Sequence, residues 1–380
     1  MQIAKTAQNQ YSTEPLLYLA FELGNKQWKL GFTIGLGQPP RQRTIPAGDL
    51  EQLHSEVAKA KQRFGLSASS RVVSCYEAGW DGFWLHRALV KAGINNVIVD
   101  SASLEVNRRF RRVKTDRVDL GKLVTMLIRY QAGEQKVWRV VRVPTLEAED
   151  GRQLHRELAS LKGERTRHIN RIKGLLVNQG VRLELKPDFE QRLAQVRLWD
   201  GSPLPPGLRG RVSREYARID LINQQIKTLE AERRALLRSA TDPQTEMIRQ
   251  LLRLRGIGPN SAWLYVKEFF GWRKFRNRRE IGALAGLTPT PYQSGDGNRE
   301  QGIAKAGNCH IRAIAIEIAW GWLRHQPDSA LSQWYQERFG HGNSRMRRIG
   351  IVALARKLLI ALWRYLETGE IPEGAVLKPA

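Results

Sequence analysis

The fold of the first part of the chain is decided by the run Leu16-Leu17-Tyr18-Leu19-Ala20-Phe21-Glu22. This apolar run ends in an acid and is followed by a turn at Gly24-Asn25 and by a second strand-like run, Gln27 to Thr33. Short apolar runs on either side of a turn are typical of paired strands. The sequence therefore predicts a β-hairpin with Glu22 at the end of its first strand.

Helical and strand-like patterns alternate after this hairpin. A helical pattern from Leu50 to Phe64 leads to the β-rich run Arg71-Val72-Val73-Ser74-Cys75, with Glu77 just past its end. A second helix is predicted around Trp84 to Leu89, and Asn96 to Asp100 makes a further buried strand. This order predicts an α/β fold in which helices pack against a mixed sheet.

The most basic stretch of the first half leads into a third predicted helix, Asp116 to Gln131. Asp116 and Asp119 lie at its start. Residues three apart share one face of a helix, so both carboxylates can point the same way. The cations before this helix are predicted to contact nucleic acid: Arg108, Arg109, Arg111, Arg112 and Lys114.

Two long amphipathic helices are predicted beyond Pro144. Apolar residues recur at three- and four-residue spacing from Leu154 to Leu176 and, after a Gly/Pro-rich break, from Val212 to Leu236. Such seams suit a coiled-coil hairpin or an oligomer contact, and packing within one chain is an alternative that the pattern leaves open. Nucleic-acid contacts are predicted on the first of these helices at Arg165, Arg167 and Arg171.

A compact, mainly α region begins after Thr241-Asp242-Pro243. Residues Leu251 to Ala262 predict a helix-hairpin-helix whose turn, with Gly256 and Gly258, offers backbone N–H groups to phosphate; a helix pair that merely packs is the alternative. A cluster of predicted nucleic-acid contacts follows at Arg273, Lys274, Arg276, Arg278 and Arg279. The boundaries predicted from these patterns are 1–140 for the α/β domain, 141–245 for the helical linker and 246–380 for the C-terminal domain.

Composition indicates the partner of the chain. Its 380 residues include 62 Lys and Arg against 37 Asp and Glu, a formal charge of +25, and its pI is near 10.5. A field of this size attracts polyanions, so nucleic acid is the expected partner.

No targeting or membrane segment is predicted. The N-terminal residues lack the apolar core of a signal peptide. The apolar segment Ile349 to Leu366 is interrupted by cations, which favours an amphipathic packed helix over a membrane span. Cys75 and Cys309 are too few for a disulfide framework or a four-ligand zinc site. The sequence predicts a soluble, reduced and intracellular protein.

Four acids, Glu22, Glu77, Asp116 and Asp119, lie at strand ends or at a helix start, where an α/β sheet gathers its site. Carboxylates brought together repel one another unless a cation lies between them. Mg²⁺ prefers oxygen ligands and keeps positions open for phosphate and water, and two such ions can hold the attacking and leaving oxygens of a phosphoryl transfer. Taken singly, each acid is also explained as a helix cap or a solvated strand end.

The loop predicted at Tyr292-Gln293-Ser294-Gly295-Asp296-Gly297-Asn298-Arg299 presents a small hydroxyl beside glycines, with Arg299 and Lys305 as predicted phosphate contacts. The Ser294 hydroxyl must be activated by a base or a metal before it can attack phosphate. His310 is as well suited to cap the following helix, and activation by the acidic metal site would meet the same need. Tyr292 is a competing nucleophile, and an ordinary surface turn is the alternative for the whole run.

Several motifs occur in a fixed order along the chain: Cys75-Tyr76-Glu77-Ala78-Gly79, Lys114-Thr115-Asp116-Arg117-Val118-Asp119, Gly256-Ile257-Gly258-Pro259, Ala285-Gly286-Leu287-Thr288-Pro289, Ser294-Gly295 and Gly302-Ile303-Ala304-Lys305-Ala306-Gly307-Asn308. Together they resemble the DEDD transposases of bacterial insertion sequences, the IS110 and IS1111 families. So long an ordered series is much more specific than any one of its motifs.

The resemblance implies an RNA-guided recombinase with a RuvC-like, RNase H-type N-terminal domain, a coiled-coil linker and a C-terminal transposase domain that bears the serine. It assigns Mg²⁺ to the four acids and the nucleophilic role to Ser294. Glu22 departs from the aspartate usual in the family, and its longer arm would shift the ion or recruit a water. Ala304 stands where the family often has serine.

The implied partners are double-stranded DNA from the element ends and target, a structured guide (bridge) RNA, and further copies of the chain, as a dimer or tetramer joined through the coiled coil. The resemblance also implies a cytoplasmic protein associated with the bacterial nucleoid. Two other functions stay open. One is a RuvC-type junction nuclease that uses metal-activated water without a covalent step. The other is a catalytically silent protein that binds DNA or RNA.

Overall fold

The computed structural model describes residues 15–37, 39–104, 116–294 and 297–379, and the side chains of 116–119, 292–294 and 297–301 lie outside that description. The chain divides into two compact units, residues 1–143 and 144–380. The three domains expected from the sequence stay a prediction.

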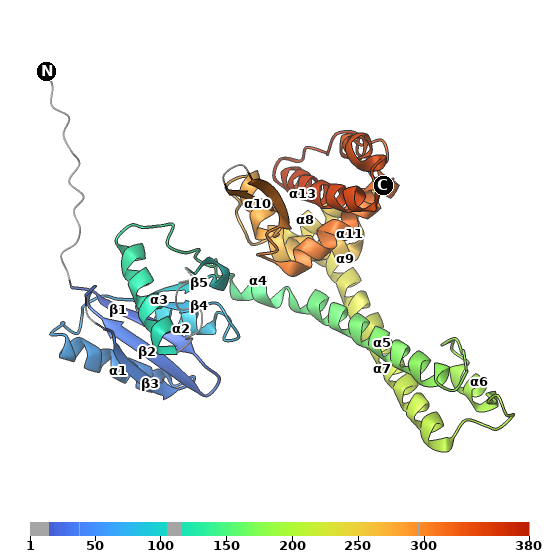
Figure 1. The fold of residues 1–380 in the computed structure, drawn as a ribbon, viewed down its shortest axis with the longest axis horizontal. Coiled ribbons are helices and arrows are strands. Elements are labelled where there is room, and N and C mark those ends of the chain that lie inside the picture. Colours follow the sequence, from blue (N-terminus) through green and yellow to red (C-terminus); the bar gives the residue numbers. More distant parts are fainter. Residues whose placement is uncertain (1–14, 38, 105–115, 295–296, 380) are drawn as a thin grey trace. The chain divides into compact units, whose positions relative to one another are not determined.

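The first unit contains a five-stranded mixed sheet in the order β3-β2-β1-β4-β5 (Figure 1). β1 pairs antiparallel with β2, and β2 with β3. β4 pairs parallel with β1 and with β5. The strands are β1 (Leu17–Leu23), β2 (Gln27–Thr33), β3 (Arg41–Pro46), β4 (Val72–Glu77) and β5 (Asn95–Val99). The predicted hairpin and mixed sheet are confirmed.

Helices cover both faces of this sheet because its strands are apolar on both sides. Leu17, Leu19 and Phe21 of β1 belong to the apolar cluster that includes α1 (Leu50–Arg63) and α2 (Trp84–Lys91). The alternate residue Ala20 belongs to a second cluster, formed with α3 (Asp116–Gln131). The three helices predicted from the sequence are therefore present, and a short 3₁₀ turn, η1 (Ser101–Ser103), follows β5.

The second unit begins with α4 (Leu146–Asp150), followed by two long helices that lie side by side (Figure 1). These are α5 (Gln153–Val177) and α7 (Pro206–Ser239), with the short α6 (Phe189–Gln195) between them. The apolar faces of α5 and α7 pack against each other within the one chain. One cluster contains Leu158, Leu161, Ile222 and Ile226. The other contains Ile172, Leu176, Val212 and Ile219. Packing within the chain, which the sequence pattern left open, thus accounts for these buried residues.

The rest of the second unit is a helical body around one large apolar cluster. Its elements are α8 (Pro243–Leu252), α9 (Pro259–Tyr265), the π-helical turn η3 (Val266–Phe270), α10 (Arg278–Leu284), β6 (Pro289–Ser294), β7 (Gly297–Ile303), α11 (Cys309–His325), α12 (Ala330–Tyr335), the π-helical turn η4 (Gln336–Gly340) and α13 (Ser344–Thr368). The predicted helix-hairpin-helix is α8, the Gly256-Ile257-Gly258 turn and α9.

α13 includes the apolar segment that the sequence assigns to a packed helix. Leu354, Leu358 and Leu362 are completely buried in the core of the second unit, whereas Lys357 is exposed on the other side. The described part of the chain has no helix with the length and apolar character that a bilayer crossing requires.

Candidate functional site

Glu22 and Glu77 occupy equivalent positions at the carboxyl ends of β1 and β4, two neighbouring parallel strands. The last paired residues of β1 and β4 are Phe21 and Tyr76, and the two glutamates come directly after them. Ala20 and Cys75, two positions earlier, pack toward α3. Because side chains alternate along a strand, both glutamates belong to the sheet face that α3 covers. Glu22 is half-buried and Glu77 is exposed.

The start of α3 lies close to this edge. Gly31 of β2 is the partner of Ala20, and a Cβ at Gly31 would lie 2.9 Å from Leu120 Cγ. α3 therefore packs directly on the strand pair that ends in Glu22. Asp116 begins α3 and Asp119 precedes Leu120, so the sequence correctly placed both acids in the first turn of a helix.

The metal site itself remains a prediction. Among the described side chains, no three His, Cys, Asp or Glu come together closely enough to hold a metal ion. The side chains of Asp116 and Asp119 lie outside that description. Cys75, beneath the helix, offers no ligand: burial raises the pKa of its thiol, which stays neutral, and its Sγ lies 3.8 Å from the Leu123 carbonyl oxygen.

Ser294 is the last residue of a strand, which corrects the loop predicted from the sequence. β6 and β7 form an antiparallel hairpin in which Tyr292 pairs with Arg299 and Ser294 with Gly297. The two prolines of β6, Pro289 and Pro291, concealed the strand because proline cannot donate to a ladder. The side chains at the serine end of the hairpin lie outside the described residues.

The hairpin is fixed at its root by two glycine turns that the sequence shows far apart. Gly286 and Gly307 both have positive φ, 68° and 98°. A Cβ on Gly307 would overlap the Leu284 carbonyl oxygen, and one on Gly286 would overlap the Ala306 carbonyl oxygen. These are close backbone approaches that only glycine permits.

Backbone hydrogen bonds join the same two turns. Lys305 N donates to Gly286 O at 3.2 Å, and Asn308 N donates to Leu284 O at 2.9 Å. Asn308 then caps α11 by accepting from the backbone N–H of His310 and Ile311. The residue that caps this helix is Asn308, and not His310 as the sequence suggested. The exposed Lys305, itself at φ 56°, completes the root.

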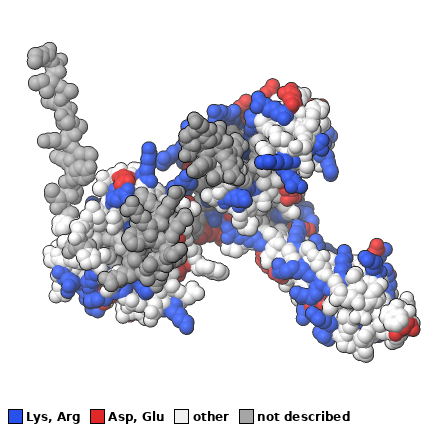
Figure 2. Space-filling model, viewed as in Figure 1, with Lys and Arg blue, Asp and Glu red and all other residues white. Residues whose placement is uncertain are grey.

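A basic groove lies beside this root, on α10, α12 and α13. Its cavity is about 800 Å³, and Pro289 and Ile303, the first pair of the hairpin, form part of its wall. Among the described side chains, six cations and no acid line it: Arg278, Arg279, Arg345, Arg348, Arg356 and Lys357. Figure 2 shows Lys and Arg side chains gathered over the C-terminal helices and along the α5–α7 pair. The sequence identified only Arg278 and Arg279, because the other four are separated from them by α11 and α12.

Other predicted phosphate contacts are engaged within the protein. Arg171 donates to the buried Glu215 of α7, at 3.0 Å. Arg165 donates to Asn223 at 3.3 Å, and the Arg273 guanidinium lies 4.2 Å from the centre of the Trp272 ring. These contacts are structural. Arg167, Lys274 and Arg276 are exposed, and the predicted contacts at Arg108, Arg109, Arg111, Arg112, Lys114 and the Arg299 side chain fall outside the described residues.

The glycines of the helix-hairpin-helix are partly covered. Gly256 has φ 85° and packs on His325, while Gly258 is the N-cap residue of α9. The Lys378 ammonium donates to Ile257 O at 2.8 Å. The turn is thus held in place from both sides by the C-terminal elements.

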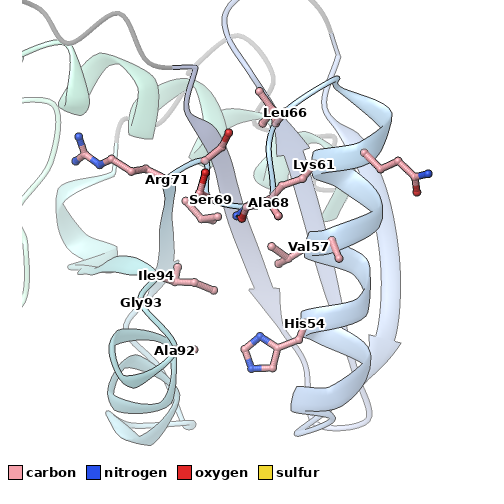
Figure 3. Close-up of a pocket in the computed structure, with 14 residues that line it drawn as sticks. His54, Val57, Lys61, Leu66, Ala68, Ser69, Arg71, Ala92, Gly93 and Ile94 are labelled. Carbon is pink, nitrogen blue, oxygen red and sulfur yellow. The ribbon is translucent and has the colours of Figure 1, made fainter.

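A second cavity, of about 630 Å³, lies in the first unit at the start of β4 (Figure 3). His54 and Lys61 of α1 line it together with Arg71, which immediately precedes the strand. Glu77 ends the same strand, so this cavity lies at the opposite end of the sheet from the predicted metal site.

Comparison with known proteins decides the family. Residues 248–336, from α8 to the start of η4, match the model described as the transposase IS116/IS110/IS902 family. The chain is 42% identical over 377 residues to the putative transposase y4rJ of Sinorhizobium fredii. The aligned residues cover 95% of this chain and 94% of that protein. The chain belongs to the IS116/IS110/IS902 transposase family.

More distant members agree with this assignment. The chain is 26% identical over 220 residues to the transposase for insertion sequence element IS1328 of Yersinia enterocolitica, covering 57% of this chain and 63% of that protein. It is 26% identical over 246 residues to the transposase for element IS1111A of Coxiella burnetii, covering 63% and 65%. The resemblance found in the sequence is confirmed at the level of this insertion-sequence transposase family, whose members process DNA.

Within this transposase the family match covers the second half of α8, the rest of the helix-hairpin-helix, the β6–β7 hairpin that carries Ser294, and both glycine turns at the root of that hairpin. The family match includes the groove residues of α10 and of the hairpin. The groove residues of α13 lie after the end of the match. A signal for the α13 cations was present in the sequence: Arg345, Arg348, Arg356 and Lys357 interrupt the apolar residues of a helical pattern.

Proposed function

We propose that this transposase cuts and exchanges DNA strands through a magnesium site at Glu22, Glu77, Asp116 and Asp119 and a nucleophile at Ser294. The observation that supports the proposal is the position of two of these acids at one edge of the sheet. Glu22 and Glu77 come directly after the last residues that the parallel strands β1 and β4 pair with each other, on the face packed by the helix that begins with Asp116.

The donor set fits the proposed ion. Four carboxylates offer only oxygen ligands, which Mg²⁺ prefers, and leave positions for phosphate and water. When bound, the ion would polarise the phosphate and favour loss of the proton from an attacking hydroxyl. The Glu22 side chain is longer than that of the aspartate usual in the family, so the ion would lie slightly farther from the backbone of β1.

The covalent step assigned to Ser294 balances without a further reactant. A bond forms between its Oγ and the DNA phosphorus while the bond from phosphorus to one sugar oxygen breaks. The hydroxyl proton leaves to a base and the departing sugar oxygen gains one. Two supports are independent of the side chain itself: Ser294 ends a strand, and the root of that strand is fixed to α10 and α11.

We further propose that a structured noncoding RNA guides the protein and that several copies of the chain act together in the bacterial cytoplasm. A charge of +25 is suited to more than one nucleic-acid strand, and sequence choice would rest with guide pairing. The α5–α7 seam is buried within the chain, so a dimer or tetramer contact would use other faces of these helices.

A nicked suicide DNA substrate tests the nucleophile, because cleavage on it leaves protein joined to DNA. Ser294→Ala is expected to abolish the adduct, and Tyr292→Phe, the matched change at the competing hydroxyl, is expected to retain it. Asp119→Asn is expected to stop all cleavage in Mg²⁺. An adduct that survives in Ser294→Ala overturns the serine assignment.

A junction nuclease without a covalent step gives a different pattern in the same assay. Ser294→Ala would then cleave normally while Asp119→Asn would not. Absence of cleavage and exchange in Mg²⁺ with the wild-type protein and its guide RNA would instead leave a nucleic-acid-binding protein without catalysis.

A further inference from the structure

We propose that the basic groove on α10, α12 and α13 holds an unpaired DNA strand next to the serine hairpin. The proposal deepens the function proposed above by naming the form of the substrate that this surface binds. It rests on three features of the groove: unpaired cations, an apolar floor, and a wall shared with the root of the hairpin.

The cations of the groove are available to a ligand. The guanidinium groups of Arg278, Arg279, Arg345 and Arg348 make no hydrogen bond or ion pair with the described part of the chain, and all four side chains are exposed. No acid among the described side chains lines the cavity to offset them. Like charges gathered in one groove repel one another, and a polyanionic backbone would relieve that repulsion. The charge therefore indicates a nucleic-acid strand rather than a protein segment.

The floor of the groove distinguishes an unpaired strand from a duplex. Between the cations it is lined by apolar side chains: Leu287, Pro289, Ile303, Trp334, Ile349, Val352, Ala353 and Ile360. A duplex presents phosphates to a protein surface and keeps the faces of its bases stacked inside. An unpaired strand exposes those faces, which aromatic and apolar side chains can cover.

Two floor residues show this character most clearly. Ile349 is 44% exposed, which leaves apolar surface for a base to cover. Trp334 is half-buried, with the Lys357 ammonium 4.6 Å from the centre of its ring and Phe339 packed edge-on at 5.7 Å. Trp334 is therefore held in its position in the floor by contacts with Lys357 and Phe339.

The groove also lies within reach of the proposed nucleophile. Pro289 and Ile303 form the first pair of the hairpin, and Ser294 ends the same strand that Pro289 begins. At about 3.3 Å per residue, the five residue steps from Pro289 to Ser294 span about 17 Å. A strand in the groove could therefore continue along the hairpin toward Ser294 over a few nucleotides.

Fluorescence anisotropy with the full chain tests the proposal, using a labelled single-stranded DNA oligonucleotide, the duplex of the same sequence and the RNA of the same sequence. Metal-free Ser294→Ala protein is used throughout, so binding is measured without chemistry. Single-stranded DNA is expected to bind more tightly than the other two. Arg345→Ala and Arg348→Ala are each expected to weaken that binding by about tenfold and to lower the salt slope by about 0.7.

Arg364→Ala is the matched control, because it removes an exposed arginine from the same helix α13 but outside the groove. This substitution is expected to leave the affinity for single-stranded DNA within about twofold of that of the Ser294→Ala protein without it. Equal losses in Arg345→Ala, Arg348→Ala and Arg364→Ala would overturn the groove assignment, since only the overall charge would then matter.

The apolar floor has its own variant. Ile349→Ser is expected to weaken single-stranded DNA about fivefold, an effect on the scale of lost base contacts, while duplex binding and the salt slope stay unchanged. Leu221→Ser, at an apolar residue of α7 that is 56% exposed and outside the groove, is its control. Equal weakening of the duplex by Ile349→Ser, or tighter binding of RNA than of DNA, would overturn the proposal. Neither outcome affects the adduct test of Ser294.

Discussion

The sheet of the first unit and the hairpin of the second both carry a predicted chemical group at a strand end, yet they are fixed by different means. The sheet lies between two apolar clusters, so burial determines where Glu22 and Glu77 lie. The two-stranded hairpin is anchored at its root, where backbone fits against backbone at Gly286 and Gly307. Burial tolerates small changes by repacking. A backbone fit at positive φ does not.

The largest effect is expected where the hairpin root is broken. Gly307→Ala places a methyl group against the Leu284 carbonyl oxygen at φ 98°. The strained backbone alone costs about 1–3 kcal/mol. Because a displacement of about 1 Å can cost about 10²-fold in rate, we expect the yield of the DNA adduct to fall about 100-fold. The suicide substrate measures this directly.

Gly369→Ala distinguishes the effect of backbone strain from the effect of a steric clash. Gly369 caps α13 with φ 77°, and a Cβ there meets nothing within 4 Å. The strain is similar, about 1 kcal/mol, but no element is displaced, so the adduct yield should stay close to that of the wild-type protein. Equal adduct yields in the two variants would contradict the proposed role of the root.

The second prediction concerns an acid whose charge the protein neutralises itself. Glu268 of η3 is only 2% exposed and accepts hydrogen bonds from His155 and Arg156 of α5, at 2.9 and 2.6 Å. Burial alone would raise the pKa of Glu268, but these hydrogen bonds lower it to about 2. Glu77 at the sheet edge is exposed instead. A buried, paired glutamate stabilises the fold, whereas an exposed one is available to a ligand.

The pKa of Glu268 lies below the 4.5 of an ordinary glutamate, so its contribution to stability is complete above pH 4.5 and is lost as pH falls toward 2. The shift corresponds to about 3 kcal/mol. Glu268→Gln should therefore lower the urea midpoint clearly at pH 6 and much less at pH 3. Glu246→Gln, at an exposed ion pair with Arg249, should change either midpoint little. If Glu268→Gln lowered the urea midpoint by the same amount at both pH values, this account would be contradicted.

The sequence predicted those parts of the fold that periodicity encodes. The apolar runs of β1 and β2, the helix from Asp116 and the long seams of α5 and α7 were all read correctly from local patterns. It missed β3, whose sequence Arg-Gln-Arg-Thr-Ile-Pro is that of a charged edge strand. It also missed β6, where two prolines hide the ladder. Both strands depend on a neighbouring strand rather than on their own apolar residues.

The candidate site divides in the same way. Motif order assigned the acids and the serine, and alternation along β1 and β4 explains why two of those acids share a face. The groove cations on α13 come together with Arg278 and Arg279 only through tertiary packing. No local pattern in the sequence brings α10 and α13 together. The same holds for Gly286 and Gly307, whose contact exists only once the hairpin between them has formed.

The smallest predicted effect tests the contact between α3 and the sheet, through two glycines that should respond with opposite signs. A methyl group at Gly31 would lie 2.9 Å from Leu120 Cγ, so Gly31→Ala forces the helix that begins with Asp116 away from the sheet; such overpacking costs about 1–2 kcal/mol. Gly121 lies in α3 with nothing within 4 Å of its missing Cβ, so Gly121→Ala should stabilise by about 0.5–1 kcal/mol through helix propensity. Urea midpoints give both signs, and cleavage in Mg²⁺ should fall only in Gly31→Ala. Full cleavage in a destabilised Gly31→Ala would mean that the position of α3 on the sheet does not set the proposed metal site.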